Sequence, residues 1–220
     1  MGPVVQLTRT GTQRADAGTL ARAREAFEQQ QLIRIPGFLA PDLRDTLADL
    51  VERAEFKHRI HHDINFAVDV SIEDPEIRWT LIFLMNDPAL FDAIRAITGC
   101  GPIGYCNPLV YKIVPDAGHF DSWHDDVDGN KMIGMSINLG RQPFSGGVLQ
   151  IRRHSTEAIL HHEHNTGFGD AMLFRIDDGL EHFVTPVTGN VPRLALAGWF
   201  QTTPDYREVA RKVFGRLAAC

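Results

Sequence analysis

The spacing of hydrophobic positions changes from a helical to a strand-like period near residue 101. Before that point, Leu43, Leu47, Leu50 and Val51 recur at the spacing of one helical face. Similar apolar faces, separated by capping residues and a Pro-Gly break, predict helices over about 19–30, 41–51 and 88–98 and a short strand over 32–35. The first hundred residues are therefore expected to be mainly helical.

After residue 101, short apolar runs alternate with turn residues. They predict strands over 109–114, 132–139, 147–152, 171–176, 182–187 and 193–200. Evenly spaced short strands are typical of an antiparallel jelly-roll barrel, so the expected fold class is mainly β with buttressing N-terminal helices. Those helices are too few to bury their own faces. Residues 1–220 are therefore predicted to form a single domain, with a helical support region over about 15–100 and a β core over about 101–203.

Composition and charge argue against several classes of protein. No apolar run approaches the roughly 20 residues of a membrane helix, and the first residues lack the apolar core of a signal peptide. The 22 basic and 28 acidic residues give a net charge of −6, which argues against a general nucleic-acid binder. Cys100, Cys106 and Cys220 have no metal-like spacing and are expected to be reduced thiols. We therefore expect a cytoplasmic protein with neither a membrane nor a nucleic-acid partner.

The most informative chemical signal is His124 and Asp126, followed by His182. Residues two apart on an extended strand point the same way, so His124 and Asp126 can reach one metal ion. His182 begins a later predicted strand and supplies a second imidazole. Two imidazoles and one carboxylate form the facial set that suits non-haem Fe(II), with coordination positions left open. Asp125 is expected to point to the opposite face of the strand.

Arg193 lies at the start of the last predicted strand. If residues 193–200 are extended, Arg193 shares a face with Ala195, Ala197 and Trp199. The alanines leave space beside a guanidinium group, which can bind a carboxylate through paired hydrogen bonds. The competing interpretation is a structural arginine that pairs with a carboxylate of the core.

The order His-X-Asp, then His, then Arg resembles the Fe(II)/2-oxoglutarate-dependent dioxygenases. Gly146-Gly147, the segment 33–43 (IRIPGFLAPDL) and the segment 182–189 (HFVTPVTG) add to the resemblance. It is closest to the compact prolyl-hydroxylase-like and phytanoyl-CoA-hydroxylase-like branch, and it covers roughly residues 32–200. The combination is specific, whereas each motif alone would be weak.

The resemblance implies a double-stranded β-helix core of the cupin-like jelly-roll type. It implies that His124, Asp126 and His182 hold Fe(II), and that Arg193 binds the distal carboxylate of 2-oxoglutarate. This cosubstrate and O2 would be consumed to hydroxylate a C–H bond, with release of succinate and CO2. The related halogenases replace the carboxylate ligand with a small residue, so the presence of Asp126 favours hydroxylation.

Further contacts to the cosubstrate are expected from polar residues near the metal ligands. Members of this family often add a tyrosine hydroxyl upstream of the first histidine, so the resemblance makes Tyr111 the candidate for a hydroxyl contact; a tyrosine packed in a strand is the alternative. Asn138 and Ser136, on the strand after the His-X-Asp loop, are additional candidates.

The substrate is expected to be an amino acid, a peptide side chain or another small metabolite. Trp123 either walls the substrate pocket or packs in the core. Arg152 either points inward to a substrate carboxylate or forms a salt bridge at the rim. The segments 57–73 and 118–123 are the expected determinants of substrate choice, and neither indicates one chemical class.

Two histidine clusters lack an accompanying carboxylate and arginine, and are predicted to be solvated loops. They are His58, His61 and His62, and His161, His162 and His164. Two other functions also stay open: a cupin-like metalloenzyme that does not use 2-oxoglutarate, and a non-catalytic β-barrel that binds a small ligand. Arg193 disfavours the first of these, and the intact ligand set disfavours the second.

Overall fold

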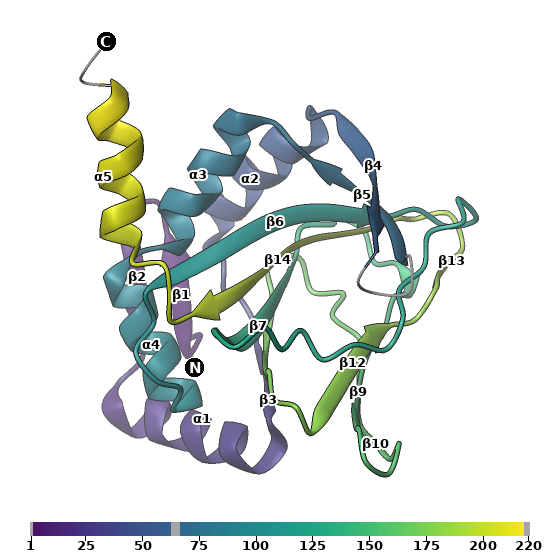
Figure 1. The fold of residues 1–220 in the computed structure, drawn as a ribbon, viewed down its shortest axis with the longest axis horizontal. Helices are drawn as coiled ribbons and strands as arrows, with labels where there is room; N and C mark the ends of the chain where they lie inside the picture. Colours follow the sequence, from purple (N-terminus) through teal and green to yellow (C-terminus); the bar gives the residue numbers. More distant parts are fainter. Residues whose placement is uncertain (1, 63–66, 218–220) are drawn as a thin grey trace.

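The computed structural model describes residues 2–62 and 67–217 (Figure 1). Cys220 and the central part of the segment 57–73 lie outside the described residues. The helices are α1 (Ala17–Gln30), α2 (Pro41–Glu52), α3 (Pro75–Met85), α4 (Pro88–Thr98) and α5 (Tyr206–Leu217). The strands are β1 (Val5–Thr8), β2 (Gly11–Arg14), β3 (Leu32–Ile35), β4 (Phe56–His61), β5 (Ala67–Ile72), β6 (Tyr105–Ile113), β7 (Lys131–Asn138), β8 (Ser145–Gly146), β9 (Leu149–Arg153), β10 (Ile159–Glu163), β11 (Ala171–Arg175), β12 (Leu180–Val184), β13 (Val187–Thr188) and β14 (Arg193–Gln201).

Two antiparallel sheets form the β core. The large sheet has the order β3-β11-β7-β14-β6-β5-β4, and the small sheet has the order β10-β9-β12. Apolar side chains of both sheets pack together in one buried cluster. The large sheet contributes Met172 and Phe174, and the small sheet contributes Leu149, Ile151 and Val184. The two sheets therefore share a core, as the strands of a double-stranded β-helix do, and the predicted fold class is confirmed.

The N-terminal helices buttress the large sheet on one side of the molecule (Figure 1). The main core joins Phe27 of α1 and Ile94 of α4 to Ile133 of β7 and Phe200 of β14, all of them fully buried. Burial of one such side chain contributes about 1.5–3 kcal/mol. This packing holds the sheet that carries most of the site residues. No helix in the described part of the chain is long and apolar enough to cross a membrane.

The ends of α4 follow from local sequence signals. Asp87 Oδ1 accepts a hydrogen bond of 2.9 Å from the Ala89 backbone N–H, and Pro88 occupies the first turn. Gly99 ends the helix with a φ of 65°, a conformation that glycine adopts without strain. Asp87 Oδ2 also accepts a hydrogen bond of 2.7 Å from the Thr12 hydroxyl, which ties the helix to β2.

Both histidine clusters that were predicted as loops lie largely on strands, so that prediction is wrong. His58 and His61 belong to β4, which pairs along its whole length with β5. His161 and His162 belong to β10, which pairs with β9. Polar residues occupy both faces of these strands, so the alternation of apolar and polar positions that marks a half-buried strand is missing. Cross-strand pairing holds them in place.

Candidate metal and cosubstrate site

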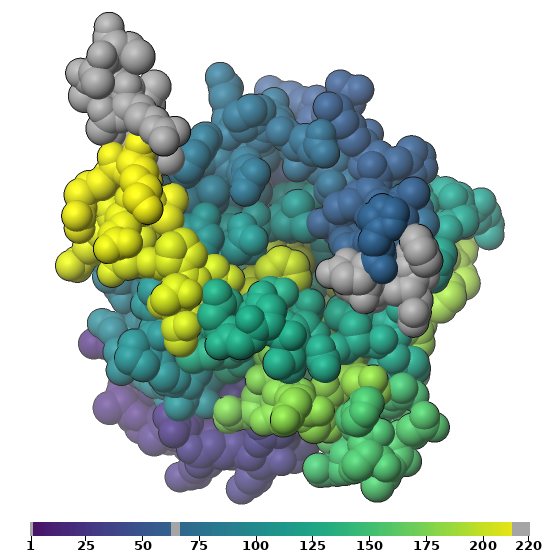
Figure 2. Space-filling view, viewed as in Figure 1, coloured from purple at the N-terminus to yellow at the C-terminus, as the bar shows by residue number. Residues whose placement is uncertain are grey.

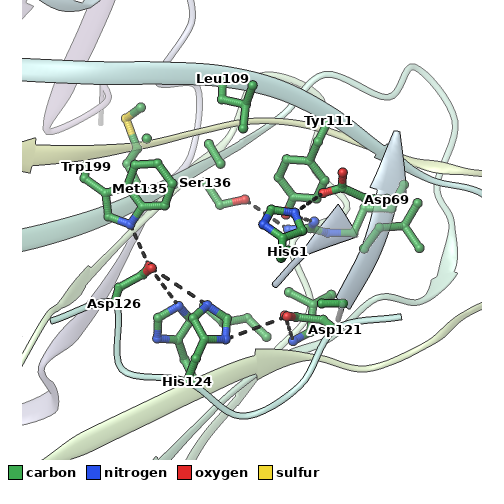
Figure 3. A pocket seen from close by; sticks show the side chains of 18 of the residues that line it. His61, Asp69, Leu109, Tyr111, Asp121, His124, Asp126, Met135, Ser136 and Trp199 are labelled. Carbon is green, nitrogen blue, oxygen red and sulfur yellow. Dashed lines mark hydrogen bonds and ion pairs between the residues drawn. The ribbon is translucent and has the colours of Figure 1, made fainter. Parts of the chain in front are cut away.

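A cavity of about 190 Å³ opens between the two sheets (Figure 3). Its walls come from β4, β5, β6, β7, β11 and β14 of the large sheet, from β9 and β12 of the small sheet, and from the segment between β6 and β7. His124, Asp126, His182 and Arg193 all line it. The folded chain therefore brings together the four residues that the sequence singled out as metal and carboxylate ligands.

A pair of backbone hydrogen bonds sets the two histidines side by side. The His124 N–H donates to the His182 carbonyl at 3.1 Å, and the His182 N–H donates to the His124 carbonyl at 2.8 Å. This isolated antiparallel bridge leaves the two imidazole centroids 4.3 Å apart. Residues directly opposite each other across strands have neighbouring side chains, which explains how positions distant in sequence meet here.

The Asp126 carboxylate reaches the two imidazoles because the backbone turns at this residue. Its φ is 60°, in the left-handed region, so His124 and Asp126 do not lie on one extended strand as predicted. Aspartate tolerates this conformation better than most residues. Asp126 Oδ2 lies 3.4 Å from His182 Nε2 and 4.0 Å from His124 Nε2. The three side chains each offer a ligand atom within 4.8 Å of the others, a spacing that could hold a metal ion.

Hydrogen bonding directs the Nε2 atom of His124 toward this point. His124 Nδ1 lies 2.7 Å from the Ser122 carbonyl oxygen, which can only accept, so the proton resides on Nδ1. Burial lowers the pKa of His124, and the adjacent imidazole of His182 lowers it further. A neutral imidazole with a free Nε2 lone pair is the form that binds metals.

Asp126 is held as a carboxylate by its neighbours. Burial alone would raise its pKa, but a hydrogen bond with His182, electrostatic interactions with both imidazoles and a hydrogen bond from the Trp199 indole together place the pKa of Asp126 well below its usual range. Trp199 Nε1 donates to Oδ2 at 2.6 Å. Lys131 Nζ lies 3.7 Å from Oδ1. The two carboxylate oxygens therefore face different partners.

Arg193 is 4% exposed and belongs to the same cavity. Its Nη1 donates to the Tyr111 hydroxyl, and its Nη2 donates to Ser136 Oγ at 3.0 Å. Among the residues that the structure describes, no carboxylate forms an ion pair with it. A buried guanidinium normally has an anionic partner, so this end of the cavity is suited to an anion.

The remaining predicted residues fall into two groups. Tyr111 and Ser136 line the cavity beside Arg193. Asn138 is buried but does not line it, and its Oδ1 accepts a hydrogen bond of 2.9 Å from the Gly140 N–H. Trp123 and Arg152 also lie outside the cavity wall. They stack on each other there, with the Arg152 guanidinium carbon 4.3 Å from the centroid of the Trp123 ring.

Arg152 has a partner of its own on the small sheet. Its Nε donates to Glu181 Oε2 at 2.7 Å, because β9 and β12 place the two residues directly opposite each other. The inward position of β9 is taken by Ile151, which is buried in the core between the sheets. The salt bridge at the rim, one of the two interpretations of Arg152, is what the structure contains.

Sequence reasoning named the segment 57–73, but it missed the group of charged residues with which β4 and β5 line the cavity. Asp69 accepts from Arg59 Nε at 3.0 Å and lies 3.3 Å from His61 Nε2. All three residues line the cavity, and Figure 3 shows His61 and Asp69 on the side opposite His124 and Asp126. The sequence signal that could have indicated this group is the placement of Arg59 and His61 two residues apart, on one face of a strand. Their pairing with Asp69 follows only from the register of β4 and β5, which places Arg59 directly opposite Asp69.

Comparison with known proteins places this site in a family context. Residues 108–201 match the family model described as the 2OG-Fe(II) oxygenase superfamily. No curated protein sequence matches the chain. The matched segment contains all four residues of the predicted metal and carboxylate site, and it confirms the resemblance drawn from them. The predicted cofactors, Fe(II) and 2-oxoglutarate, are those that the family description names.

Solved structures support the same fold. A prolyl-4-hydroxylase from Pseudomonas putida is 23% identical, with 84% of this chain and 99% of that chain covered and a TM-score of 0.63. An oxidoreductase of the 2OG-Fe(II) oxygenase family from Burkholderia pseudomallei is 14% identical, with coverage of 91% and 97% and a TM-score of 0.68. The epimerase SnoN in complex with Fe3+, alpha-ketoglutarate and nogalamycin RO is 12% identical, with coverage of 84% of each chain and a TM-score of 0.61.

Proposed function

We propose, from the match of residues 108–201 to the family model of the 2OG-Fe(II) oxygenase superfamily, that the chain is an Fe(II)- and 2-oxoglutarate-dependent hydroxylase. Its substrate would carry an unactivated C–H bond on an amino acid, a peptide or another small metabolite. The reaction would consume 2-oxoglutarate and O2 and release succinate and CO2. His124, Asp126 and His182 would hold Fe(II), and Arg193 would hold the cosubstrate.

The observation that carries this proposal is the buried Arg193 without a carboxylate partner among the described residues. It lies in the same cavity as the three proposed metal ligands, beside two hydroxyl groups. A cupin-like metalloenzyme without 2-oxoglutarate would have no need of a buried cation there. A dicarboxylate with one end at the metal and the other at Arg193 supplies the missing anion.

The residues present also fit Fe(II). Two imidazoles and one carboxylate are the donor set of non-haem Fe(II) oxygenases, and they leave further coordination positions open. When bound, Fe(II) and 2-oxoglutarate would supply the oxidation itself. The chain would position the substrate and cosubstrate and exclude water from the site.

The chain's own groups have distinct tasks in this scheme. The Ser122 carbonyl holds the Nδ1 proton of His124, and Trp199 orients the Asp126 carboxylate. Tyr111 and Ser136 would share the far carboxylate of the cosubstrate with Arg193. The apolar side chains of Leu149, Phe174 and Val184 line the same cavity and exclude water from it.

Hydroxylation is preferred over two other outcomes. Halogenation would need the position that Asp126 occupies. Epimerisation is the activity of SnoN, which has the same fold, so the fold alone does not decide the outcome. With 18O2, a hydroxylase places one labelled oxygen in the product and one in succinate. An epimerase would leave the product unlabelled.

The test of the site is anaerobic addition of Fe(II) and then 2-oxoglutarate to metal-free protein. We expect a weak visible charge-transfer band that requires both additions and is absent from His124→Ala. The matched control is His154→Ala, because His154 is 64% exposed and pairs with Glu181 outside the cavity. A band that persists in His124→Ala, or that fails to form although iron is bound, would contradict the proposal.

A further inference from the structure

A second hollow adjoins the metal-site cavity. It is a groove of about 850 Å³ bounded by β4, β5, α3 and β6. Arg59, His61, Leu109 and Trp199 line both spaces, so the groove meets the cavity at these side chains. In Figure 2 the surface is hollowed between the blue residues of this region and the teal residues below them. The two spaces are therefore neighbours at Trp199.

The groove has an apolar floor. Ile72, Ile77, Leu81 and Val110 line it, and each is at least nine-tenths buried. Ile60 contributes a large apolar side chain that is 53% exposed at the edge. The floor is already almost fully buried, so an apolar ligand would mainly remove the exposed Ile60 side chain from water, which favours its binding.

The charges around the groove are cationic, although the whole chain has a net charge of −6. Arg78 of α3 is exposed and makes no ion pair with any described residue. Glu73, the acidic residue of the lining, is paired with Lys57 at 3.2 Å. Arg59 is held by Asp69. Arg78 is thus the cation available to a ligand, and it would attract an anionic group.

The edge of β6 does not offer a template for an extended peptide. The Asn86 side chain accepts from the Cys106 N–H at 2.8 Å and donates to the Cys106 carbonyl at 2.9 Å. Pro108 lies two residues farther on the same edge and has no N–H. Because β-strand addition needs these backbone groups, the groove favours a ligand that binds through its apolar body.

We propose that the substrate is an elongated small-molecule carboxylic acid, whose apolar body lies in the groove and whose carboxylate binds Arg78. Its far end passes between Arg59, His61 and Trp199 to reach the metal-site cavity. This inference rests on the proposed function and names the substrate class of the same site. Arg78 and Ile60 are then specificity-determining residues that touch the substrate but not the metal.

The test measures binding apart from turnover. Decanoate, decan-1-ol, acetate and an acidic hexapeptide capped at both ends are titrated by calorimetry into wild-type protein loaded anaerobically with Fe(II) and 2-oxoglutarate. We expect decanoate to bind at least about tenfold more tightly than either acetate or the hexapeptide, because only decanoate joins an apolar body to one carboxylate. The visible band of the same samples reports on the proposed function, so its loss and a loss of decanoate binding are distinguishable.

Two variants assign the binding to the groove. Arg78→Gln should weaken decanoate about five- to tenfold and leave decan-1-ol unchanged, since only the charged contact is removed. Ile60→Asp should weaken both probes. Arg14→Gln, an exposed arginine on β2, is the matched control and should change neither.

Three results would overturn the inference. They are equal binding of acetate and decanoate, unchanged decanoate affinity in Arg78→Gln, and tighter binding of the capped peptide than of decanoate. The last result would identify a peptide as the occupant of the groove.

Discussion

Trp199 donates a hydrogen bond of 2.6 Å from its indole Nε1 to Oδ2 of Asp126. The same oxygen lies 3.4 Å from His182 Nε2, at the point where the two histidines converge. Lys131 Nζ lies 4.4 Å from the centroid of the Trp199 ring and 3.7 Å from the other carboxylate oxygen. The indole therefore fixes the orientation of a carboxylate whose backbone is already in an unusual conformation.

Removing this hydrogen bond should weaken metal binding. We predict that Trp199→Phe keeps the ring but lowers Fe(II) affinity about tenfold, because groups that orient a metal ligand contribute about 10- to 100-fold. Anaerobic Fe(II) titration measures the change. Trp123→Phe, in which the lost indole lies outside the cavity, should bind Fe(II) like the wild type. Equal affinities in all three proteins would remove Trp199 from this role.

Arg193→Met should separate cosubstrate binding from metal binding. Loss of the guanidinium leaves the far carboxylate of 2-oxoglutarate unpaired in a buried place, so we expect at least about a hundredfold weaker 2-oxoglutarate binding. Fe(II) affinity should change little. The concentration of 2-oxoglutarate that half-saturates the visible band is the measurement, and Arg153→Met, an exposed arginine at the end of β9, is the control. An unchanged half-saturation would show that Arg193 has a structural role only.

Asp69 should make stability depend on pH in the acidic range. Burial would raise its pKa, but hydrogen bonds and charges from His61 and Arg59 lower the pKa of Asp69 below its ordinary value. Because the folded pKa is depressed, the stabilisation is present above the unfolded pKa of about 4 and is lost as pH falls through the folded pKa. Between about pH 5 and pH 3, the unfolding temperature of the wild type should therefore fall more steeply than that of Asp69→Asn.

The control for this pH series is Asp178→Asn, at an exposed turn position. That variant should follow the wild-type curve. If the unfolding temperatures of the wild type and Asp69→Asn change in parallel with pH, the charge of the Asp69 carboxylate does not contribute to stability.

Asn86 should be important for stability rather than for chemistry. It is 2% exposed and links the end of α3 to β6 through hydrogen bonds to the Ile82 carbonyl and to both backbone groups of Cys106. Asn86→Ala leaves these buried groups unpaired, so we expect a loss of about 3 kcal/mol in the free energy of unfolding. Denaturant unfolding measures it. Asn190→Ala, at an exposed turn, should stay within about 0.5 kcal/mol of the wild type.

Much of the β core could be predicted because each strand carries its own pattern. On β14 the alternation places Arg193, Ala197 and Trp199 at the cavity and Leu196 and Phe200 in the main core. The helix over 88–98 could be predicted because Asp87 and Gly99 are local end signals. In both cases the information lies within a few residues of the element that it specifies.

Other features could not be predicted from local patterns. The sequence favoured Asp126 through an extended strand, whereas its left-handed φ depends on the surrounding loop. Arg152 is one strand position away from pointing inward, and its pairing with Glu181 depends on the register of β9 and β12. A shift of one residue in that register would exchange the two faces.

The sequence by itself determined which chemical groups are available and in what order: an imidazole and a carboxylate two positions apart, a second imidazole, and an arginine on a strand lined with alanines. The tertiary structure decided which groups share one space. It paired His124 with His182, placed Arg193 beside Tyr111, and brought Arg59, His61 and Asp69 to the opposite wall. The physical reason is that alternation along a strand records burial locally, whereas cross-strand register depends on contacts between segments far apart in the chain.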